Sequence, residues 1–319
     1  MLSTRKPVLA RASPLRTLVL PAGMLLFALF SGAAAAQAQP VEMPSAELQV
    51  LHVKPSQADA AVRAFDEPNL VVLPRGVAID APLAVFLPGT GGRPENARLL
   101  LAVIAQQGYR AIGLAYNNEP AVVQLCPKHP QPECSADFRR ERVFGGLENA
   151  PVSNPVDESI VRRLVMLLRY LHKLQPDAQW QQYLDGHEPA WSRIVVSGLS
   201  QGAGMAAYIA KQRAVARVVL FSSPWTFYGP QKRLAPWLSA PSATTADRWF
   251  AALHQRENTA ALIAQAYRLL AIPDNQVRVL DLESSDGGRG ANPFHASTVR
   301  FAGYQPDWQW LYGRAASAR

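Results

Sequence analysis

One short segment constrains the fold more than any other part of the chain. It is Gly198-Leu199-Ser200-Gln201-Gly202, which follows the apolar run 193–197 and precedes the helical pattern 201–213. A serine in this context occupies a sharp turn from strand to helix, where side chains larger than glycine would collide with both elements. The segment therefore predicts an α/β sheet with a serine hydroxyl at the carboxyl end of one strand.

Short apolar runs alternate with helical patterns along most of the chain. The later runs are continuously apolar, which is typical of strands buried on both faces of a parallel sheet, whereas the first two suit an antiparallel edge. We predict one α/β domain over residues 39–319, with helices on both faces of a mostly parallel eight-stranded sheet. The predicted strands are residues 48–53, 70–73, 83–87, 109–116, 193–197, 218–221, 249–253 and 277–282, and the predicted helices are residues 97–107, 156–174, 201–213 and 259–271.

The second of these helices carries the clearest pattern. Asn154 is a candidate N-cap, Pro155 suits the first helical position, and Gln175-Pro176 is a stop signal. One apolar stripe follows helical spacing and predicts the face that packs on the sheet. Its residues are Ile160, Leu164, Leu167, Leu168 and Leu171.

Residues 1–38 have the pattern of an export signal. Four basic residues precede the apolar run 18–30, and the small residues of 31–38 offer cleavage sites, of which we favour the one after Ala38. A retained membrane anchor is disfavoured because the apolar run is too short to cross the bilayer and contains Pro21 and Gly23. We therefore expect a periplasmic or secreted protein without a stable membrane anchor.

The positive charge of the chain is concentrated in this leader. The whole chain has 32 Lys and Arg against 24 Asp and Glu, a net charge of +8. Without residues 1–38, 28 basic residues face 24 acidic ones, a net charge of +4. Clusters such as Arg139-Arg140 are typical of solvated faces and lack a pattern of stacking aromatics. We expect no nucleic-acid partner.

The two cysteines, Cys126 and Cys134, close a short proline-rich loop. In an oxidising compartment such a pair persists as a disulfide bond, and no CxxC redox motif is present. The sequence therefore predicts a structural disulfide, with free thiols or a metal site as the alternatives.

A reactive serine needs a base, and the position of each histidine separates the six candidates. Four of them, His52, His129, His172 and His187, lie in strands, helices or loops where a surface or packing role is expected, whereas His295 follows the last predicted strand. The triad carboxylate should lie at a strand end between Ser200 and His295. Glu257, after strand 249–253, is our preferred acid. Asp281, Glu283 and Asp286 are the alternatives.

The loop after the third predicted strand is rich in glycine. Its sequence, Pro88-Gly89-Thr90-Gly91-Gly92-Arg93, allows close approach of the backbone to a substrate. We expect the oxyanion to be bound by the Gln201 N–H together with an N–H from Thr90 or Gly91. A phosphate-binding loop is disfavoured because the GxxxxGK[ST] spacing is missing.

Ser200, Glu257 and His295, in this chain order, resemble the α/β-hydrolase superfamily. The likeness spans nearly all of the chain after the leader, and the run 191–204 is similar to secreted bacterial hydrolases of unassigned substrate. It implies an α/β-hydrolase fold and a serine hydrolase that cleaves carboxylic esters, small or polymeric, through an acyl-enzyme intermediate.

The same resemblance implies no cofactor and no metal. A metal pair of His254 and Glu257 is disfavoured because no partner histidine lies at suitable spacing. A peptidase, a thioesterase or an acyltransferase would use the same triad, and a non-catalytic binding protein is a further alternative. The sequence leaves the oligomeric state open.

Two long segments are candidates for the walls of the substrate site. Residues 117–153 form a long connection after the fourth predicted strand and include the two cysteines. Residues 223–248 carry several aromatic side chains at a place where a lid often lies. We expect these segments to set specificity.

Overall fold

Eight strands form the main sheet of the structure, a computed structural model that describes residues 47–283, 292 and 294–313. Strand β2 is antiparallel to both of its neighbours, and every other neighbouring pair in this sheet is parallel. This arrangement confirms the predicted α/β-hydrolase fold. In spatial order the strands are β1 (Leu48–Val53), β2 (Asn69–Pro74), β4 (Arg110–Gly113), β3 (Leu83–Leu87), β7 (Ile194–Leu199), β8 (Arg217–Phe221), β11 (Trp249–His254) and β12 (Val277–Leu280).

All eight predicted strands are present, and the largest difference in bounds concerns β4. The sequence predicts residues 109–116, but the strand ends at Gly113. Beyond that point the Ala115 N–H donates to the side-chain oxygen of Asn69 in β2, at 2.8 Å, instead of to a main-chain carbonyl of the ladder. The predicted leader, residues 1–38, lies outside the described residues.

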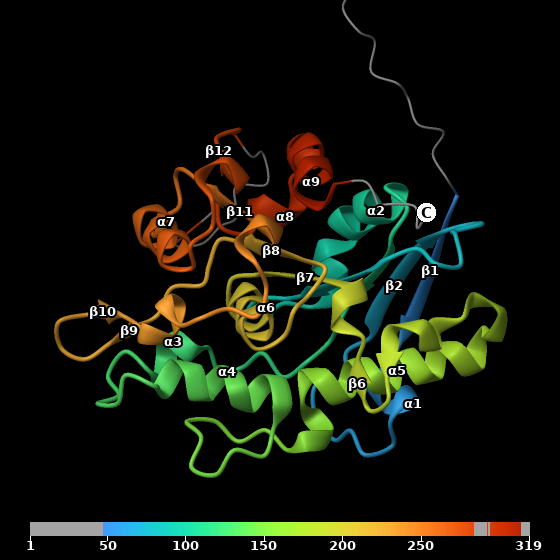
Figure 1. The fold of residues 1–319 in the computed structure, drawn as a ribbon, viewed down its shortest axis with the longest axis horizontal. Helices are drawn as coiled ribbons and strands as arrows, with labels where there is room; N and C mark the ends of the chain where they lie inside the picture. Colours follow the sequence, from blue (N-terminus) through green and yellow to red (C-terminus); the bar gives the residue numbers. More distant parts are fainter. Residues whose placement is uncertain (1–46, 284–291, 293, 314–319) are drawn as a thin grey trace, which may run out of the picture. The chain divides into compact units, whose positions relative to one another are not determined.

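Helices cover both faces of the sheet (Figure 1). Because side chains alternate along each strand, Val85 and Leu87 pack into one core while Ala84 and Phe86 pack into the other. The first core is covered by α4 (Cys134–Phe144), α5 (Ile160–Leu174), α6 (Gln201–Gln212) and α7 (Ala260–Leu269), and the second by α2 (Arg98–Gln106), α8 (Ser297–Arg300) and α9 (Gln305–Tyr312).

Helix α5 begins later than predicted. Its N-cap is Ser159, whose hydroxyl accepts a hydrogen bond from the Arg162 N–H at 3.2 Å. The prediction that Asn154 and Pro155 start this helix is wrong, because a short 3-10 turn over Val156–Glu158 separates them from it. The predicted apolar stripe is confirmed, since all five of its residues are buried.

Helix α4 was expected to be an irregular connection. Its sequence is rich in charged residues, and Arg139, Glu141 and Arg142 are nevertheless buried. Charges on the buried side conceal the periodicity that normally reveals a helix. The predicted disulfide is confirmed: Cys126 follows α3 (Val122–Leu125) and is bonded to Cys134, the first residue of α4.

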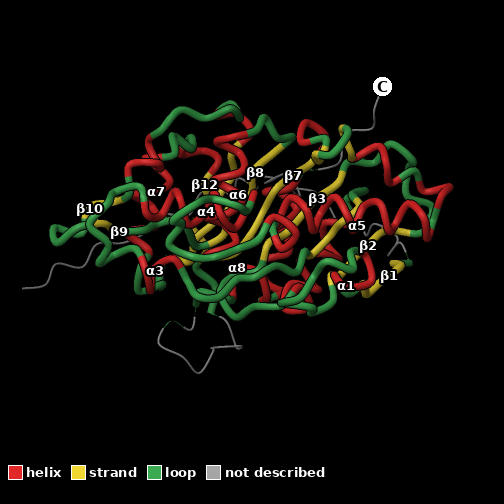
Figure 2. Tube along the Cα trace, turned by 90° about the horizontal axis from the view of Figure 1, so that it is seen from below, coloured by secondary structure: helices red, strands yellow, loops and turns green. Residues whose placement is uncertain are grey.

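Smaller elements complete the structure. The hairpin of β9 (Phe227–Tyr228) and β10 (Arg233–Leu234) lies beside α3 in both Figure 1 and Figure 2. The others are α1 (Pro55–Ala58) and the short pair β5 (Leu184–Asp185) and β6 (Glu188–Pro189). None of the helices in the described part of the chain combines the length and the hydrophobicity needed to cross a membrane.

Candidate active site

Ser200 occupies the turn between β7 and α6, as the glycine pattern predicts. Its φ is +55°, in a region that non-glycine residues rarely adopt. The strained backbone is held by main-chain hydrogen bonds, because the Ser200 N–H donates to Phe221 O at 2.9 Å and Ser200 O accepts from the Gly204 N–H at 3.1 Å. Such strain is typical of functional turns.

The two glycines of the motif allow backbone segments to touch. A Cβ atom on Gly202 would lie 2.0 Å from Leu87 O, and one on Gly198 would lie 2.4 Å from the carbonyl carbon of Gly202. Neither contact leaves room for a side chain. Helix α6 therefore begins directly against the end of β3, from which the glycine-rich loop departs.

His295 and Glu257 are brought together from separate parts of the chain. The Nδ1 atom of His295 lies 2.7 Å from Glu257 Oε2. The Glu257 side chain is completely buried, while that of His295 is 27% exposed. One nitrogen of the His295 ring is thus held by a buried carboxylate, while part of the ring remains exposed to solvent.

Glu257 accepts further hydrogen bonds on its other oxygen. The Ser222 hydroxyl donates to Oε1 at 2.7 Å, and the His254 N–H donates to the same atom at 2.9 Å. Thr298 links both sides, because its hydroxyl donates to His295 O at 3.0 Å and lies 3.3 Å from that of Ser222. No sequence motif marks Ser222 or Thr298, and neither was predicted, although Ser222 directly follows a buried strand.

A buried tyrosine lies close to this carboxylate. The pKa of Tyr267 is raised well above its ordinary value, first by burial and then by the charge of Glu257. Its hydroxyl donates to Ala252 O at 2.8 Å. Tyr267 therefore stays protonated and neutral beside Glu257.

The alternative acids occupy different surroundings. Asp281 and Glu283 are exposed, and Glu283 forms an ion pair with Arg256. Asp286 lies outside the described residues. Among the residues that the structure describes, neither Asp281 nor Glu283 forms a hydrogen bond or ion pair with a histidine, whereas Glu257 contacts the imidazole of His295.

Ser200 and His295 line the same two cavities. One has a volume of about 160 Å³ and an apolar wall that includes Phe86, Leu199 and Val299. The other has a volume of about 180 Å³ and is also lined by Val122 and Trp225, among other residues. Thr90 lines both cavities. Parts of the two predicted wall segments, 117–153 and 223–248, thus lie beside Ser200.

The predicted oxyanion donors differ in their surroundings. Gln201 is the first residue of α6, where backbone N–H groups lack partners within the helix. The Gly91 N–H is engaged, because it donates to Asn118 Oδ1 at 3.0 Å. Within residues 47–283, 292 and 294–313, the Thr90 N–H has no hydrogen-bond partner.

Asn118 joins the glycine-rich loop to the start of α6. Its side chain accepts from the Gly91 N–H and donates to Gly92 O at 2.8 Å. Its main-chain oxygen accepts from the Gln201 side chain at 2.6 Å, and the Gln201 side-chain oxygen accepts from the Val122 N–H at 2.8 Å. Asn118 was not predicted as a site residue, although it follows the carboxyl end of β4 by five residues.

Arg139 is a buried cation in the wall of the 180 Å³ cavity. Its guanidinium donates to Ser135 O and to the Thr226 hydroxyl, and it lies 4.6 Å from the centre of the Trp237 ring. Burial lowers the pKa of Arg139 to about 9. A positive charge with uncharged hydrogen-bond partners therefore lies close to Ser200.

A possible metal pair, His254 and Glu257, has other roles. The His254 ring is buried and stacks on Phe294, with 4.4 Å between ring centres, and its Nε2 lies 3.1 Å from Leu282 O. Across the described residues, no group of three or more potential metal ligands is found.

Comparisons with known proteins give structural likenesses only. No family model and no curated protein matches the sequence. A dienelactone hydrolase from Anabaena variabilis is similar at 18% identity with a TM-score of 0.42, over 84% of this chain and 99% of that one. A bacterial heroin esterase is 13% identical with a TM-score of 0.44, over 86% and 85% of the two chains. Esterase 2 from Thermogutta terrifontis is 16% identical with a TM-score of 0.40, over 87% and 98%.

Proposed function

We propose that this protein is a serine hydrolase that cleaves carboxylic esters through Ser200, His295 and Glu257. The observation that carries the proposal is the 2.7 Å contact between His295 and the buried Glu257, made by a histidine that lines two cavities together with Ser200. A carboxylate that orients an imidazole beside a partly exposed serine is the arrangement that activates a hydroxyl nucleophile.

In the proposed reaction, Ser200 Oγ attacks the ester carbonyl while His295 Nε2 takes the hydroxyl proton. The carbon–oxygen bond to the alcohol then breaks, and the alcohol leaves with that proton. A water molecule attacks the acyl enzyme in the same way and releases the acid. Glu257 holds the Nδ1–H and stabilises the imidazolium that forms in both steps.

The negative charge on the carbonyl oxygen needs two donors. We assign them to the N–H groups of Gln201 and Thr90, because Thr90 lines both cavities beside Ser200 and the Gly91 N–H is engaged by Asn118. The start of α6 adds the positive end of a helix dipole. The small volumes of the two cavities favour esters with a short acyl chain.

The proposed location is the periplasm or the extracellular space. The basic and apolar pattern of residues 1–38 and the disulfide of Cys126 and Cys134 support export into an oxidising compartment. A small-molecule or polymeric ester is the proposed substrate, and neither nucleic acid nor a membrane anchor has a part in the proposal.

A test combines covalent labelling with turnover. The wild-type protein should be labelled by a fluorophosphonate and should hydrolyse p-nitrophenyl acetate. Ser200→Ala should abolish the labelling and lower kcat by at least about a thousandfold, because the nucleophile is lost. Ser192→Ala, which removes an exposed hydroxyl just before the amino end of β7, is the matched control and should behave as wild type.

Two results would contradict the proposal. One is a folded wild-type protein that is neither labelled nor active on any acyl substrate, which would favour a binding protein. The other is equal activity of wild type and Ser200→Ala, which would assign the nucleophile elsewhere.

A further inference from the structure

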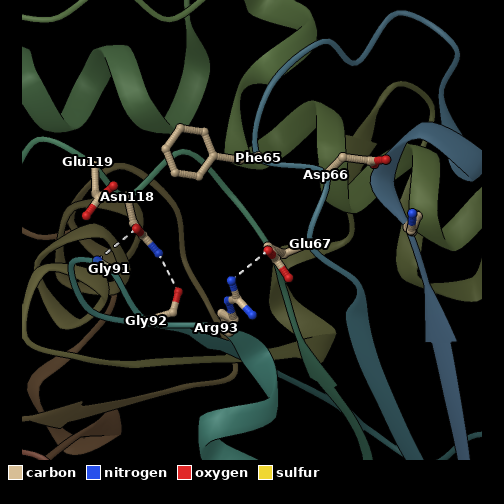
Figure 3. Close-up of a pocket in the computed structure, with 9 residues that line it drawn as sticks. Phe65, Asp66, Glu67, Gly91, Gly92, Arg93, Asn118 and Glu119 are labelled. Carbon is tan, nitrogen blue, oxygen red and sulfur yellow. Dashed lines mark hydrogen bonds and ion pairs between the residues drawn. The ribbon is translucent and has the colours of Figure 1, made fainter.

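A larger cavity, of about 540 Å³, lies beside the glycine-rich loop (Figure 3). Its wall combines charged side chains of both signs with one aromatic ring. The function proposed above assigns no role to it. The lining residues that matter here are Phe65, Glu67, Gly92, Arg93, Asn118 and Glu119.

This cavity shares part of its wall with the proposed active site. Gly92 and Arg93 line it and also line the 160 Å³ cavity that contains Ser200 and His295. The Asn118 side chain is bonded to both Gly91 and Gly92 and so fixes the loop that separates the two spaces. A substrate with its ester at Ser200 therefore has a second place for another part of the same molecule.

The polar groups of the wall supply both hydrogen-bond donors and acceptors. Arg93 and Glu67 form an ion pair at 3.0 Å, and both side chains are partly exposed to solvent. Glu119 is exposed and forms no ion pair with any residue of 47–283, 292 and 294–313. Figure 3 shows Glu119 beside Asn118, and Glu67 turned towards Arg93. Free oxygen atoms and free N–H groups thus face one cavity.

The aromatic side chain of the wall is held in a strained backbone. Phe65 has a φ of +50°, which is rare for an aromatic residue. The buried Arg163 guanidinium donates to Phe65 O at 3.0 Å and to Ala64 O at 2.6 Å, and it is paired with Glu158. Residues held in such conformations by their surroundings are frequent at ligand clamps.

We propose that this cavity binds a polyhydroxylated ring, so that the substrate is a short-chain ester of a sugar. Hydroxyl groups both donate and accept, which matches carboxylate oxygens and guanidinium N–H groups in one wall. The Phe65 ring supplies an apolar surface for the C–H groups of the sugar. This inference rests on the function proposed above, because it supplies the alcohol part of the ester.

A charged ligand fits the same wall less well. The two signs of charge are mixed, and the unpaired carboxylate of Glu119 is exposed, where an ion pair contributes little. Neutral hydroxyls use both kinds of group at once. The cavity volume also lies in the range of pockets that bind small molecules.

The test compares two acetates that each carry an acetoxymethyl arm on a six-membered ring, 6-O-acetylglucose with ring hydroxyls and cyclohexylmethyl acetate without them, by acetate release. The wild-type protein should show a kcat/KM about tenfold higher for the sugar ester, since each satisfied hydrogen bond is worth roughly that factor. Glu119→Ala, Arg93→Ala and Phe65→Ala should each lower this ratio severalfold. Asp177→Ala, which removes an exposed carboxylate outside the cavity and outside both predicted wall segments, should leave the ratio unchanged.

The outcomes separate this inference from the proposed function. Equal kcat/KM values for the two esters, or ratios unaffected by all three variants, would overturn the inference while esterase activity persists. A preference for acetylcholine would assign a cation to the cavity and would also overturn it. Loss of activity on every ester, including p-nitrophenyl acetate, would overturn the function itself and the sugar site with it.

Discussion

Two carboxylates near the glycine-rich loop and the serine turn are held in opposite ways. Glu257 is fully buried and contacts three partners, namely Ser222, His254 and His295. Glu119 is exposed and is anchored mainly through its backbone, whose carbonyl accepts from Arg142. The first side chain is fixed by its surroundings, whereas the second is free to adapt to a ligand.

This difference in burial predicts different roles for the two side chains, Glu257 in the proposed reaction and Glu119 in substrate recognition. A buried charge interacts strongly with its neighbours because the surrounding dielectric constant is low. Its hydrogen bonds are already formed, so little reorganisation is needed during the reaction. An exposed charge is screened, so its effect on one ligand is small. Changes near Glu257 should therefore have large effects on every ester. Changes at the 540 Å³ cavity beside the glycine-rich loop, the polar cavity, should have small effects that depend on the substrate.

The largest effect is expected at the acid. Glu257→Gln removes the charge that stabilises the His295 imidazolium and should lower kcat on p-nitrophenyl acetate by about a thousandfold or more. Asp281→Asn, at an exposed alternative acid, should leave kcat within about twofold of wild type. Steady-state measurements of kcat for the two variants show which carboxylate is the triad acid. Full activity of the first with loss in the second would reverse the assignment.

The next effect concerns stability on the side of the polar cavity. Burial raises the pKa of Glu158, but the Arg63 N–H and the Arg163 guanidinium lower it more, so the net pKa is below its ordinary value. Glu158→Gln leaves Arg163 buried without its charge partner and should lower the free energy of unfolding by about 3 kcal/mol at pH 7.

The sign of the pH dependence follows from this lowered pKa. The ionised form of Glu158 stabilises the fold, so its contribution is complete above the pKa of an unfolded glutamate, about 4.3, and is lost as the pH falls below it. Urea unfolding at pH 7 and pH 3.5 should show a gap between wild type and Glu158→Gln that narrows in acid. A gap that widens in acid would contradict the lowered pKa.

A smaller effect is expected where the two regions meet. Asn118→Ala frees the Gly91 N–H and Gly92 O, so the loop that carries Thr90 loses its anchor, and kcat should fall about tenfold to thirtyfold with little change in KM. Asn118→Asp keeps the acceptor for Gly91 and should retain more activity. A variant that unfolds at lower temperature yet keeps the wild-type kcat would show that Asn118 is only structural.

The smallest effect is expected at Ser222. Ser222→Ala removes one of the donors to Glu257, while His254 and His295 remain, and kcat should fall by about fivefold to tenfold. Ser242→Ala, whose hydroxyl bonds main-chain oxygens away from the site, is the control.

Local patterns were enough to predict the sheet. Each of the eight strands is a short apolar run, and burial between two helix layers makes that signal strong at residues such as Val196 and Leu220. Helix α4 was not predicted because its buried face contains Arg139 and Arg142. Their guanidinium groups form hydrogen bonds to segments that are distant in sequence. Periodicity carries no information about such partners.

The order of residues along the chain was enough to predict the three candidate triad residues, but not the residues that support them. Ser200, Glu257 and His295 each follow a strand, so the topology brings them to one sheet edge. The choice between Thr90 and Gly91 depends on the Asn118 side chain, and the support of Glu257 depends on Ser222. These contacts join segments far apart in sequence, and no motif marks them.

The direct contact between Gly202 and the end of β3 has a consequence for how such a protein diversifies. The turn that carries Ser200 and the loop that carries Thr90 meet through main-chain atoms, with no side chain interposed. Their separation is therefore insensitive to the residues that surround them. Substitutions at Phe65, Glu67 or Glu119 can therefore change which substrate binds without changing the distance between the Ser200 turn and the Thr90 loop.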